Sequence, residues 1–447
     1  MPRNNNPHNN QTSSDHENKL RWWQLSLLGV ACTIGTGYFL GAGLAITIGG
    51  PSVLISFVIA AIGTYLVFDV LAQMTAEHPV KGSFRSYAKQ AYGRWAGFSS
   101  GWVYWSSELL ITGSQLTALS LFSRFWFPNI PMWVLASVFA ILGLAIIFAG
   151  TKGFERMENV FAIIKVSAII MFIVLGVLAL CGVLGQGKSN PSFPFDTFFE
   201  KGFIGLWSSL LFAFYAFGGI EIMGIMAIRL QEPKDAPKSG RVMLSLIAII
   251  YVVSLTLTII MISWKTLNTK ESPFLQALHQ YELPFVPHLF IGILIIAGFS
   301  TMVASLFAVT SMLVTLAEDD DAPSLFAKKT KNRPLFAIGL TTAALILSIV
   351  CAMLLPGKVY VYITTAAGLM LLYNWFFILI TSGSILQLTK WGKMKRFLGM
   401  LILLTAISGS LFHHTSRPGF FVSLGFLLLI TIVTLLIRRK WKKNIKE

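Results

Sequence analysis

Long apolar stretches dominate this sequence of 447 residues and constrain its fold more than any other feature. A helix of about 20 apolar residues is long enough to cross the hydrocarbon core of a bilayer. Hydrophobic residues make up 55% of the chain and charged residues only 12%, a balance that is unusual for a soluble protein. We therefore expect an all-α integral membrane protein with twelve transmembrane helices. The predicted spans are residues 20–48, 51–78, 96–123, 131–150, 157–185, 201–230, 242–264, 289–317, 335–355, 358–388, 397–412 and 419–437.

The net charge of +16 is distributed unevenly between the segments that connect these spans. With the N-terminus inside, 27 of the 35 basic residues fall on the inner side, seven on the outer side and one, Lys165, within a span. Membrane proteins show this bias because their cytoplasmic loops carry an excess of Lys and Arg. The charge therefore requires no nucleic acid partner. We expect a multi-pass protein of the cell membrane with both termini in the cytoplasm.

The same pattern divides the chain into four regions. Residues 1–19 are polar and rich in Asn, with no apolar segment ahead of a cleavage site, so we expect a disordered cytoplasmic tail rather than a signal peptide. Residues 20–388 hold the first ten spans and are predicted to form the core of the protein. Residues 389–437 form two peripheral helices, and residues 438–447 form a basic cytoplasmic tail.

The sequence contains none of the residue clusters on which the common classes of enzymes depend. Cys32, Cys181 and Cys351 are widely spaced within apolar segments, where small packing residues are expected rather than a disulfide framework. The seven histidines form no cluster with metal-ligand spacing. No Ser/His/Asp arrangement or cofactor-binding loop is present either. We therefore expect no metal, no cofactor and no enzymatic activity.

The first span is interrupted by glycine near its centre. Residues 32–46 read CTIGTGYFLGAGLAI, in which Gly35, Thr36 and Gly37 form a compact break signal. Glycine weakens a helix by about 1 kcal/mol relative to alanine and adopts positive φ freely. A helix that stops and restarts is one interpretation, and a packing face from Gly37 to Gly41 is the other. A phosphate-binding loop is disfavoured, because no strand precedes the glycines and no Lys-Ser/Thr follows them.

The sixth span has a second interruption about halfway along, at Phe217, Gly218 and Gly219. A tolerated packing kink would explain this break alone. Five spans precede the sixth, so equivalent breaks at the start of each half predict an inverted five-plus-five repeat. Discontinuous helices at corresponding positions also mark the binding site of many transporters. The last two spans would then be peripheral to the repeat.

An unwound backbone within the membrane has a specific chemical use. Its unpaired N–H and C=O groups cost several kcal/mol each in hydrocarbon, so both breaks are expected to face protein or a wet cavity. Amides at the half-helix that follows Gly37 could receive a carboxylate, and carbonyls freed at the other half-helix could accept an ammonium group. An α-amino acid carries both groups. Tyr215 and Phe217 flank the second break and could close over such a ligand, although core packing is the simpler interpretation of aromatic residues.

Three ionisable residues lie deep within predicted spans. Lys165 is about 13 Å into the fifth span at 1.5 Å per residue, near the bilayer centre. A charge at that depth costs about 2.5–3.5 kcal/mol, and such residues usually face the interior and serve function. Proton coupling is one role for Lys165, and a permanent structural tie to helix carbonyls is the alternative. Glu221 follows the second break and is a further proton-coupling candidate, whereas Glu108 could be functional or structural.

Several motifs together carry a resemblance to a known family. They are IGTGYFLGAG (34–43), HPVKGSFRSYAKQAYG (78–93), GFSSGWVYW (97–105), ENVFAIIKV (158–166), FYAFGGIE (214–221), EPKDAPKSG (232–240) and LAEDDDAP (316–323). Over nearly its full length the chain resembles the amino acid permeases of the amino acid, polyamine and organocation transporter superfamily. The resemblance implies the leucine-transporter fold, with an amino acid held between broken first and sixth helices.

The resemblance also implies roles for individual residues. It places substrate contacts at Gly35, Thr36 and Gly37, an aromatic gate at Tyr215, and pocket backbone at Phe217, Gly218 and Gly219. The family's fifth-helix lysine, which takes the place of a sodium ion, corresponds to Lys165 and implies proton coupling. The chain departs from the family at four polar positions that belong to gating networks. One of them, Gln115 in the third span, is also a candidate polar site residue within the membrane. These positions are Gln73, Gln115, Arg229 and Ser311.

From the sequence we expect a permease that imports a neutral, apolar amino acid together with protons by alternating access. Its partners would be the amino acid, protons and the lipid bilayer. An exchanger that swaps amino acids without proton coupling is one alternative. A membrane sensor related to germinant receptor subunits, which binds an amino acid without transporting it, is another.

Overall fold

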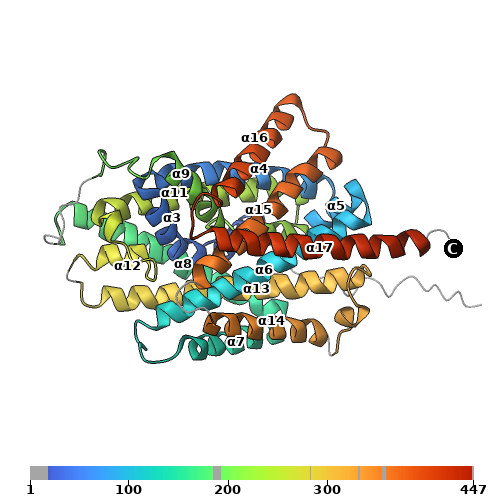
Figure 1. Ribbon diagram of the computed structural model, residues 1–447, viewed down its shortest axis with the longest axis horizontal. Helices are drawn as coiled ribbons and strands as arrows, with labels where there is room; N and C mark the ends of the chain where they lie inside the picture. The colour runs from blue at the N-terminus through green and yellow to red at the C-terminus, as the bar shows by residue number, and fades with distance from the viewer. Residues whose placement is uncertain (1–18, 185–192, 282, 331–332, 355–358, 445–447) are drawn as a thin grey trace, which may run out of the picture.

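The computed structural model describes residues 19–184, 193–281, 283–330, 333–354 and 359–444 (Figure 1). The described chain is helical throughout, with no β-strand beyond two isolated bridges. The helices are α1 (Trp22–Thr33), α2 (Thr36–Phe39), α3 (Gly41–Gly49), α4 (Val53–Glu77), α5 (Phe84–Tyr92), α6 (Arg94–Ser123), α7 (Met132–Ala149), α8 (Thr151–Leu180), α9 (Gly202–Tyr215), α10 (Ile220–Met226), α11 (Ala236–Met261), α12 (Pro273–Leu278), α13 (Val286–Glu318), α14 (Leu335–Leu354), α15 (Val359–Ile385), α16 (Lys390–Gly409) and α17 (Arg417–Asn444). The disordered tail predicted at residues 1–19 lies outside the described residues, except for Lys19.

Every predicted span overlaps at least one helix, and the first overlaps three consecutive helices, α1, α2 and α3. By length and composition, eight helical stretches of the described chain are able to cross a membrane. The third predicted span, α6, is not among the eight, because Ser, Thr, Gly and Gln interrupt its apolar sequence. Most of α6 is nevertheless buried, and it packs against α13 and α15, so its polar residues face protein rather than lipid. The count of twelve spans stays a prediction.

Two helices are interrupted where glycine predicted a break. The helix that begins at Trp22 ends at Thr33, and α2 begins at Thr36. The helix α9 ends at Tyr215, and α10 begins at Ile220 after a turn in which Gly219 has a φ of +116°. That φ lies in the left-handed region, which glycine adopts without a steric penalty. After the first break the chain runs through α2 and α3. A turn at Gly50 then leads into α4, which corresponds to the second predicted span.

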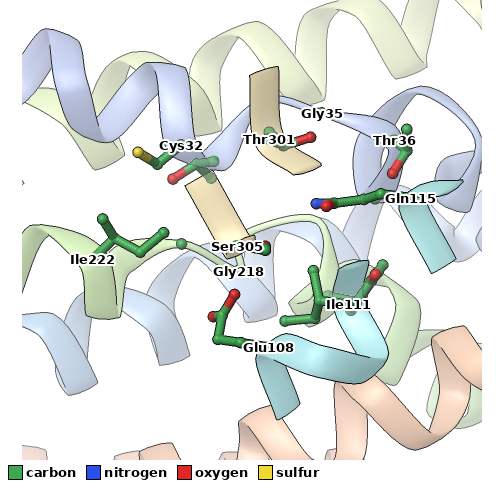
Figure 2. Close-up of a pocket in the computed structure, with 14 residues that line it drawn as sticks. Cys32, Gly35, Thr36, Glu108, Ile111, Gln115, Gly218, Ile222, Thr301 and Ser305 are labelled. Atoms are coloured by element: carbon green, nitrogen blue, oxygen red, sulfur yellow. The ribbon is translucent and has the colours of Figure 1, made fainter. Parts of the chain in front are cut away.

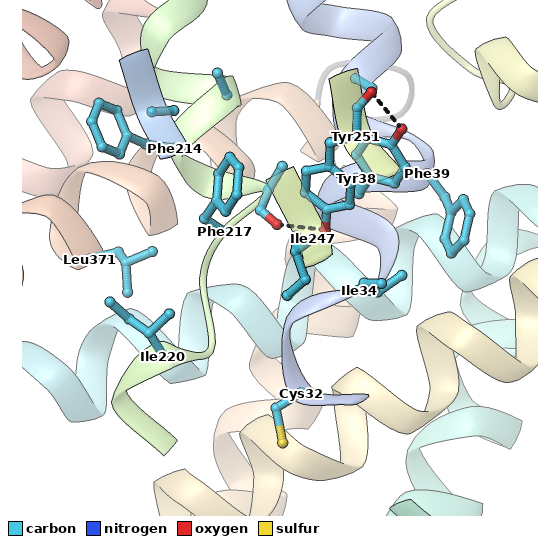
Figure 3. Packing of buried hydrophobic residues seen from close by; sticks show 14 of the residues in the cluster. Cys32, Ile34, Tyr38, Phe39, Phe214, Phe217, Ile220, Ile247, Tyr251 and Leu371 are labelled. Carbon is cyan, nitrogen blue, oxygen red and sulfur yellow. Dashed lines mark hydrogen bonds between the residues drawn. The ribbon is translucent and has the colours of Figure 1, made fainter. Parts of the chain in front are cut away.

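The interrupted segments touch each other in the middle of the bundle. A Cβ atom placed on Gly219 would lie 2.8 Å from the carbonyl oxygen of Cys32, so glycine permits this approach. Beyond the breaks, Tyr38 stacks on Tyr251 with 3.6 Å between ring centroids, and Phe217 packs on Tyr251 from the other segment (Figure 3). These rings are completely or almost completely buried. Aromatic packing of this kind holds the two segments at a fixed separation.

The short amphipathic helix α5 is tied to the far end of α13 by ion pairs. Arg85, which is fully buried, donates to Asp319 at 2.7 Å and to Asp321, and Lys89 donates to Asp319 at 3.1 Å. Arg94, at the start of α6, donates to the other oxygen of Asp321 at 2.8 Å. We call Arg85, Lys89, Arg94, Asp319 and Asp321 the ion-pair cluster. It joins α5, α6 and the end of α13 into one unit.

We predict that Asp321→Asn destabilises the folded protein by about 3–5 kcal/mol, because it removes a buried partner of the buried Arg85. Thermal unfolding of the purified protein in detergent measures the change. Lys81 is the matched control, since its pair with Glu318 is exposed and exposed pairs contribute only about 0–1 kcal/mol. Equal losses of stability for Asp321→Asn and Lys81→Ala would contradict this account of the cluster.

The pH dependence of stability gives a second prediction. Burial raises the pKa of Asp319, but hydrogen bonds from Arg85 and Lys89 outweigh it, so the pKa falls below the ordinary value of 3.8. A carboxyl whose pKa is lowered by folding stabilises the protein above its ordinary pKa, and this contribution is lost as the pH falls through the folded value. We expect Asp319→Asn to lower the melting temperature at pH 7 and to lose this effect progressively below about pH 4. A difference that is unchanged between pH 7 and pH 3 would contradict the prediction.

Candidate binding site between the interrupted helices

A small cavity lies where the two interruptions meet, with α6 and α13 closing its sides (Figure 2). The cavity volume is about 30 Å³. This is room for about two water molecules and lies far below the range of about 300–1,000 Å³ typical of small-molecule sites. The lining residues are Cys32, Thr33, Gly35, Thr36, Gly37, Glu108, Ile111, Gln115, Tyr215, Gly218, Gly219, Ile222, Thr301 and Ser305. The cavity is therefore closely walled in this conformation, and a ligand larger than water enters it only if the walls separate.

The first break leaves backbone carbonyls at the end of α1 without helical partners. The last helical bond of this segment runs from the Ile34 amide to the Val30 carbonyl, and Gly35 has an extended backbone. The carbonyl of Ala31 would otherwise pair with the amide of Gly35. Instead, the ammonium group of Lys165 on α8 donates to the Ala31 carbonyl, and Lys165 is fully buried. A charged side chain thus caps the broken end of α1.

The second break is capped by other side chains. The Glu221 carboxyl accepts a hydrogen bond from the Gly219 amide at 3.0 Å and another from the Trp375 indole on α15. The Tyr251 hydroxyl donates to the Ala216 carbonyl at 3.0 Å (Figure 3). A carboxyl at the first turn of α10 is also favoured by the helix dipole. These contacts satisfy backbone groups that a break would leave unpaired in a membrane.

Four buried polar atoms at the cavity have no hydrogen-bond partner among the described residues. They are Thr33 Oγ1, Thr36 Oγ1, Glu108 Oε2 and Gln115 Oε1. Figure 2 shows Thr36 and Gln115 near the first break and Glu108 on the opposite wall, near Gly218. Buried polar atoms usually find partners, because a missing hydrogen bond costs about 1–3 kcal/mol. The convergence of four such atoms on one cavity indicates a site for a polar ligand or water.

The structure brings together most of the residues that the sequence singled out. Of the residues singled out from the sequence, those that line the cavity are Gly35, Thr36, Gly37, Glu108, Gln115, Tyr215, Gly218 and Gly219. Phe217 lies in the aromatic contacts with Tyr251 and Phe57 and does not line the cavity. Lys165 and Glu221 are buried behind the walls, where each caps a broken helix end. Gln73, Arg229 and Ser311 lie outside the lining.

Sequence reasoning missed one wall of the cavity. Thr301 and Ser305 on α13 line it, and their spacing of four residues places them on one helix face. Small polar residues on one face of an otherwise apolar span were the available signal. Ile111 and Ile222 supply apolar surface, and isolated Ile residues in membrane helices carry no such signal. Cys32, expected to be a packing residue, also lines the cavity.

Helices interrupted around a small polar cavity in an apolar bundle are typical of secondary transporters, and this architecture defines the class of the protein. Residues 24–387 match the amino acid permease family. The chain therefore belongs to the amino acid permeases of the amino acid, polyamine and organocation transporter superfamily, and it is a multi-pass membrane protein of amino acid transport.

Similar proteins occur in several bacteria. The uncharacterized transporter YcgH of Bacillus subtilis (strain 168) is 54% identical over 434 residues, which is 96% of this chain and 97% of the relative. The aromatic amino acid transport protein AroP of Escherichia coli (strain K12) is 30% identical over 442 residues, with 96% of each chain covered. The uncharacterized amino acid permease YvbW of Bacillus subtilis (strain 168) is 29% identical over 361 residues, covering 79% of this chain and 80% of the relative.

We predict that Gly219→Ala destabilises the protein and impairs transport. A side chain at this φ costs about 1–2 kcal/mol, and the new Cβ would lie 2.8 Å from the Cys32 carbonyl, which forces the two breaks apart. Melting temperature and uptake into vesicles measure the two effects. Gly41→Ala is the matched control, because its nearest neighbouring atom is 3.7 Å away, and we expect nearly unchanged stability. Normal stability and uptake in Gly219→Ala would contradict the close contact between the breaks.

Proposed function

We propose that this permease imports a neutral amino acid with an apolar side chain by proton-coupled symport, through alternating access to one central site. The observation that carries the proposal is the set of four unpartnered polar atoms that converge on the cavity between the two breaks. A zwitterion brings a carboxylate and an ammonium group, which together supply the acceptors and donors that such a site lacks. The family membership supports an amino acid as the substrate.

In the proposed complex the two charged groups of the substrate bind opposite parts of the cavity. The carboxylate lies against the first amides after the break, those of Thr36 and Gly37, and accepts from the Thr36 hydroxyl. These amides have no acceptor within the helix that they begin, and the start of a helix favours negative charge. The ammonium group lies against carbonyls at the end of α1 and the carboxyl of Glu108. Both ends of the zwitterion are thereby hydrogen-bonded in a site with little water.

The apolar part of the lining sets the proposed side-chain preference. Ile111, Ile222 and the ring of Tyr215 line the cavity, and Glu108 is the one carboxyl among its lining residues. A charged substrate side chain would lack a second partner there, so an uncharged one is favoured. The similarity to AroP, an aromatic amino acid transport protein, supports an apolar or aromatic side chain. An aromatic side chain is larger than the central cavity, so its binding requires the walls to separate, as the proposed alternating access provides.

Lys165 and Glu221 are the proposed proton-coupling groups. Each is fully buried and hydrogen-bonded to backbone at a broken helix end, Lys165 to Ala31 and Glu221 to Gly219. Loss or gain of a proton changes the hydrogen bonds that either group can make. A protonation change would therefore alter the capping of the half-helices that enclose the substrate. This link gives the proton a route to affect the conformation of the site.

We further propose a leucine-transporter architecture for the chain. The ten spans within residues 20–388 form two inverted halves, and the broken helices open each half. The helices α16 and α17 are peripheral, and both termini lie in the cytoplasm of a cell-membrane protein. The position of each break in the first span of its half, and the basic bias of the predicted cytoplasmic segments, support this arrangement.

Uptake into proteoliposomes tests the function. Purified protein is reconstituted, and the entry of radiolabelled amino acids is followed with and without an inward proton gradient. Gradient-driven accumulation of an apolar amino acid is expected. Uptake that requires amino acid inside the vesicle would instead indicate exchange, and binding without flux would indicate a sensor. A thermal-shift panel of the twenty amino acids identifies the ligand beforehand, because a ligand that binds only the folded state raises its stability.

We predict that Lys165→Met abolishes gradient-driven accumulation, because methionine, one atom shorter, fills most of the space of the lysine but can neither carry a proton nor donate to Ala31. The initial uptake rate at imposed proton gradients measures the effect. Lys265→Met is the matched control, since Lys265 is an exposed lysine paired with Glu200. Accumulation that persists in Lys165→Met, with Lys265→Met unchanged, would remove the coupling role from Lys165 and leave only its structural one.

A further inference from the structure

A second and larger cavity lies at the edge of the bundle, between α6, the segment after α13 and the C-terminal half of α17. Its volume is about 510 Å³, against about 30 Å³ for the central cavity. Its walls are mainly apolar and include Phe98, Trp102, Leu429 and Val433. The helix α17 contacts α6 beside this space, through a hydrogen bond of 3.1 Å between Ser99 and Thr434 and through ring contact between Phe98 and Trp441.

The position of the cavity places it next to lipid. Only 17% of the apolar stretch of α17 is buried within the protein, so most of this helix faces its surroundings. In a membrane those surroundings are acyl chains, which have the same apolar character as the cavity walls. Water in a space of this kind would find few partners, because the walls offer few polar atoms. An acyl chain is therefore the natural occupant of the apolar part.

Three indole side chains line the cavity, and such side chains favour the level of the lipid headgroups. Trp441 lies against Phe98 near the start of α6, whereas Trp102 and Trp105 follow about one and two turns further along α6. The Trp102 indole donates to the Asp321 carbonyl at 3.3 Å, whereas Trp105 Nε1 is buried without a hydrogen-bond partner among the described residues. Trp105 thus offers a donor at a lining position. An ester oxygen at the head of an acyl chain would satisfy it.

The charges at the end of the cavity beside Trp441 favour an anionic headgroup. The C-terminal turns of α17 extend beyond the rest of the bundle (Figure 1). They carry the basic residues Arg438, Arg439, Lys440, Lys442 and Lys443. The guanidinium of Arg94 lies over the Trp441 ring, 4.6 Å from its centroid. The nearby carboxylates Asp319 and Asp321 are already paired within the ion-pair cluster, whereas Asp320, which also lines the cavity, makes no ion pair among the described residues. The five basic residues of α17 therefore exceed the one remaining carboxylate.

We propose that this cavity binds an anionic phospholipid, with one acyl chain between α6 and α17 and the phosphate at the end of the cavity where the sequence of α17 is basic. A basic cluster that directly follows a membrane helix is the usual recognition element for anionic headgroups. The bound lipid fills the gap between α17 and α6 and fastens the peripheral helix to the core. The proposal depends on membrane insertion alone, so it is independent of the transported substrate.

Lipid titration of the purified, delipidated full-length protein tests the proposal. Phosphatidylglycerol is expected to raise the melting temperature at much lower concentration than phosphatidylcholine with the same acyl chains. Replacement of Arg438, Arg439 and Lys440 by Gln is expected to weaken the apparent affinity for phosphatidylglycerol about a hundredfold and to leave phosphatidylcholine unchanged. Equal stabilisation by the two lipids in the wild type would overturn the anionic specificity.

A cavity-filling variant tests the location of the lipid. Val433→Trp places an indole in the cavity and is expected to abolish the phosphatidylglycerol effect, whereas Leu428→Trp, at a 63% exposed position of the same helix, is expected to retain it. If Val433→Trp does not fold, fluorescence quenching replaces it. Phosphatidylglycerol with brominated acyl chains is expected to quench the wild type more than Trp105→Phe. Retained lipid response in folded Val433→Trp, or equal quenching in both proteins, would overturn the proposed site.

Discussion

The structure depends on one constraint, which is that backbone N–H and C=O groups cannot remain unpaired in hydrocarbon. A continuous membrane helix meets this constraint within itself, but an interrupted one does not. Each break in this chain is therefore placed against protein. The first ends beside α8 and α13, the second beside α11 and α15, and Gly219 lies against Cys32 where the breaks meet. The unpaired backbone groups of both breaks require polar partners, and the breaks meet at one place, where the central cavity lies.

The capping groups come from different elements, which makes the broken ends interdependent. Lys165 from α8 serves the end of α1, Tyr251 from α11 serves the end of α9, and Trp375 from α15 supports the carboxyl that serves α10. A displacement of α8 or α11 must break a buried hydrogen bond to a backbone carbonyl, and a displacement of α15 must break the bond that supports the Glu221 carboxyl. Such groups lose more free energy than exposed ones when a partner is removed. The half-helices are thus coupled to the surrounding bundle through their caps.

The sequence made the breaks predictable, and with them most of the cavity. Glycine at Gly35, Gly37 and Gly219 is a local signal, because it reports a backbone need that acts within a few residues. The wall from α13 was not predictable in the same way, because Thr301 meets Gly35 only through tertiary packing. Mean hydropathy also fails to identify α6 as a membrane-crossing helix, because its polar residues, which are buried between helices, lower the value. What the sequence leaves open is therefore the set of neighbours, which depends on contacts between segments far apart in the chain.

The two ends of the bundle, on either side of the central cavity along α13, are held by different kinds of contact. Toward the start of α13, Phe274 packs on Tyr38, and Phe172 packs on both Phe274 and Phe290. Toward the other end of α13 the ion-pair cluster closes the bundle. Rings can separate in small steps, because dispersion is spread over many weak contacts.

A buried guanidinium cannot separate from its carboxylates in that way. If Arg85 lost Asp319 and Asp321 without replacement by water, it would remain as an uncompensated charge in the protein interior. In the proposed transport cycle, opening at the ion-pair cluster therefore requires water to enter with the movement. Opening at the aromatic end requires only that rings slide apart. The two openings are physically different steps, and their balance depends on the hydration of the cluster as well as on the occupant of the central cavity.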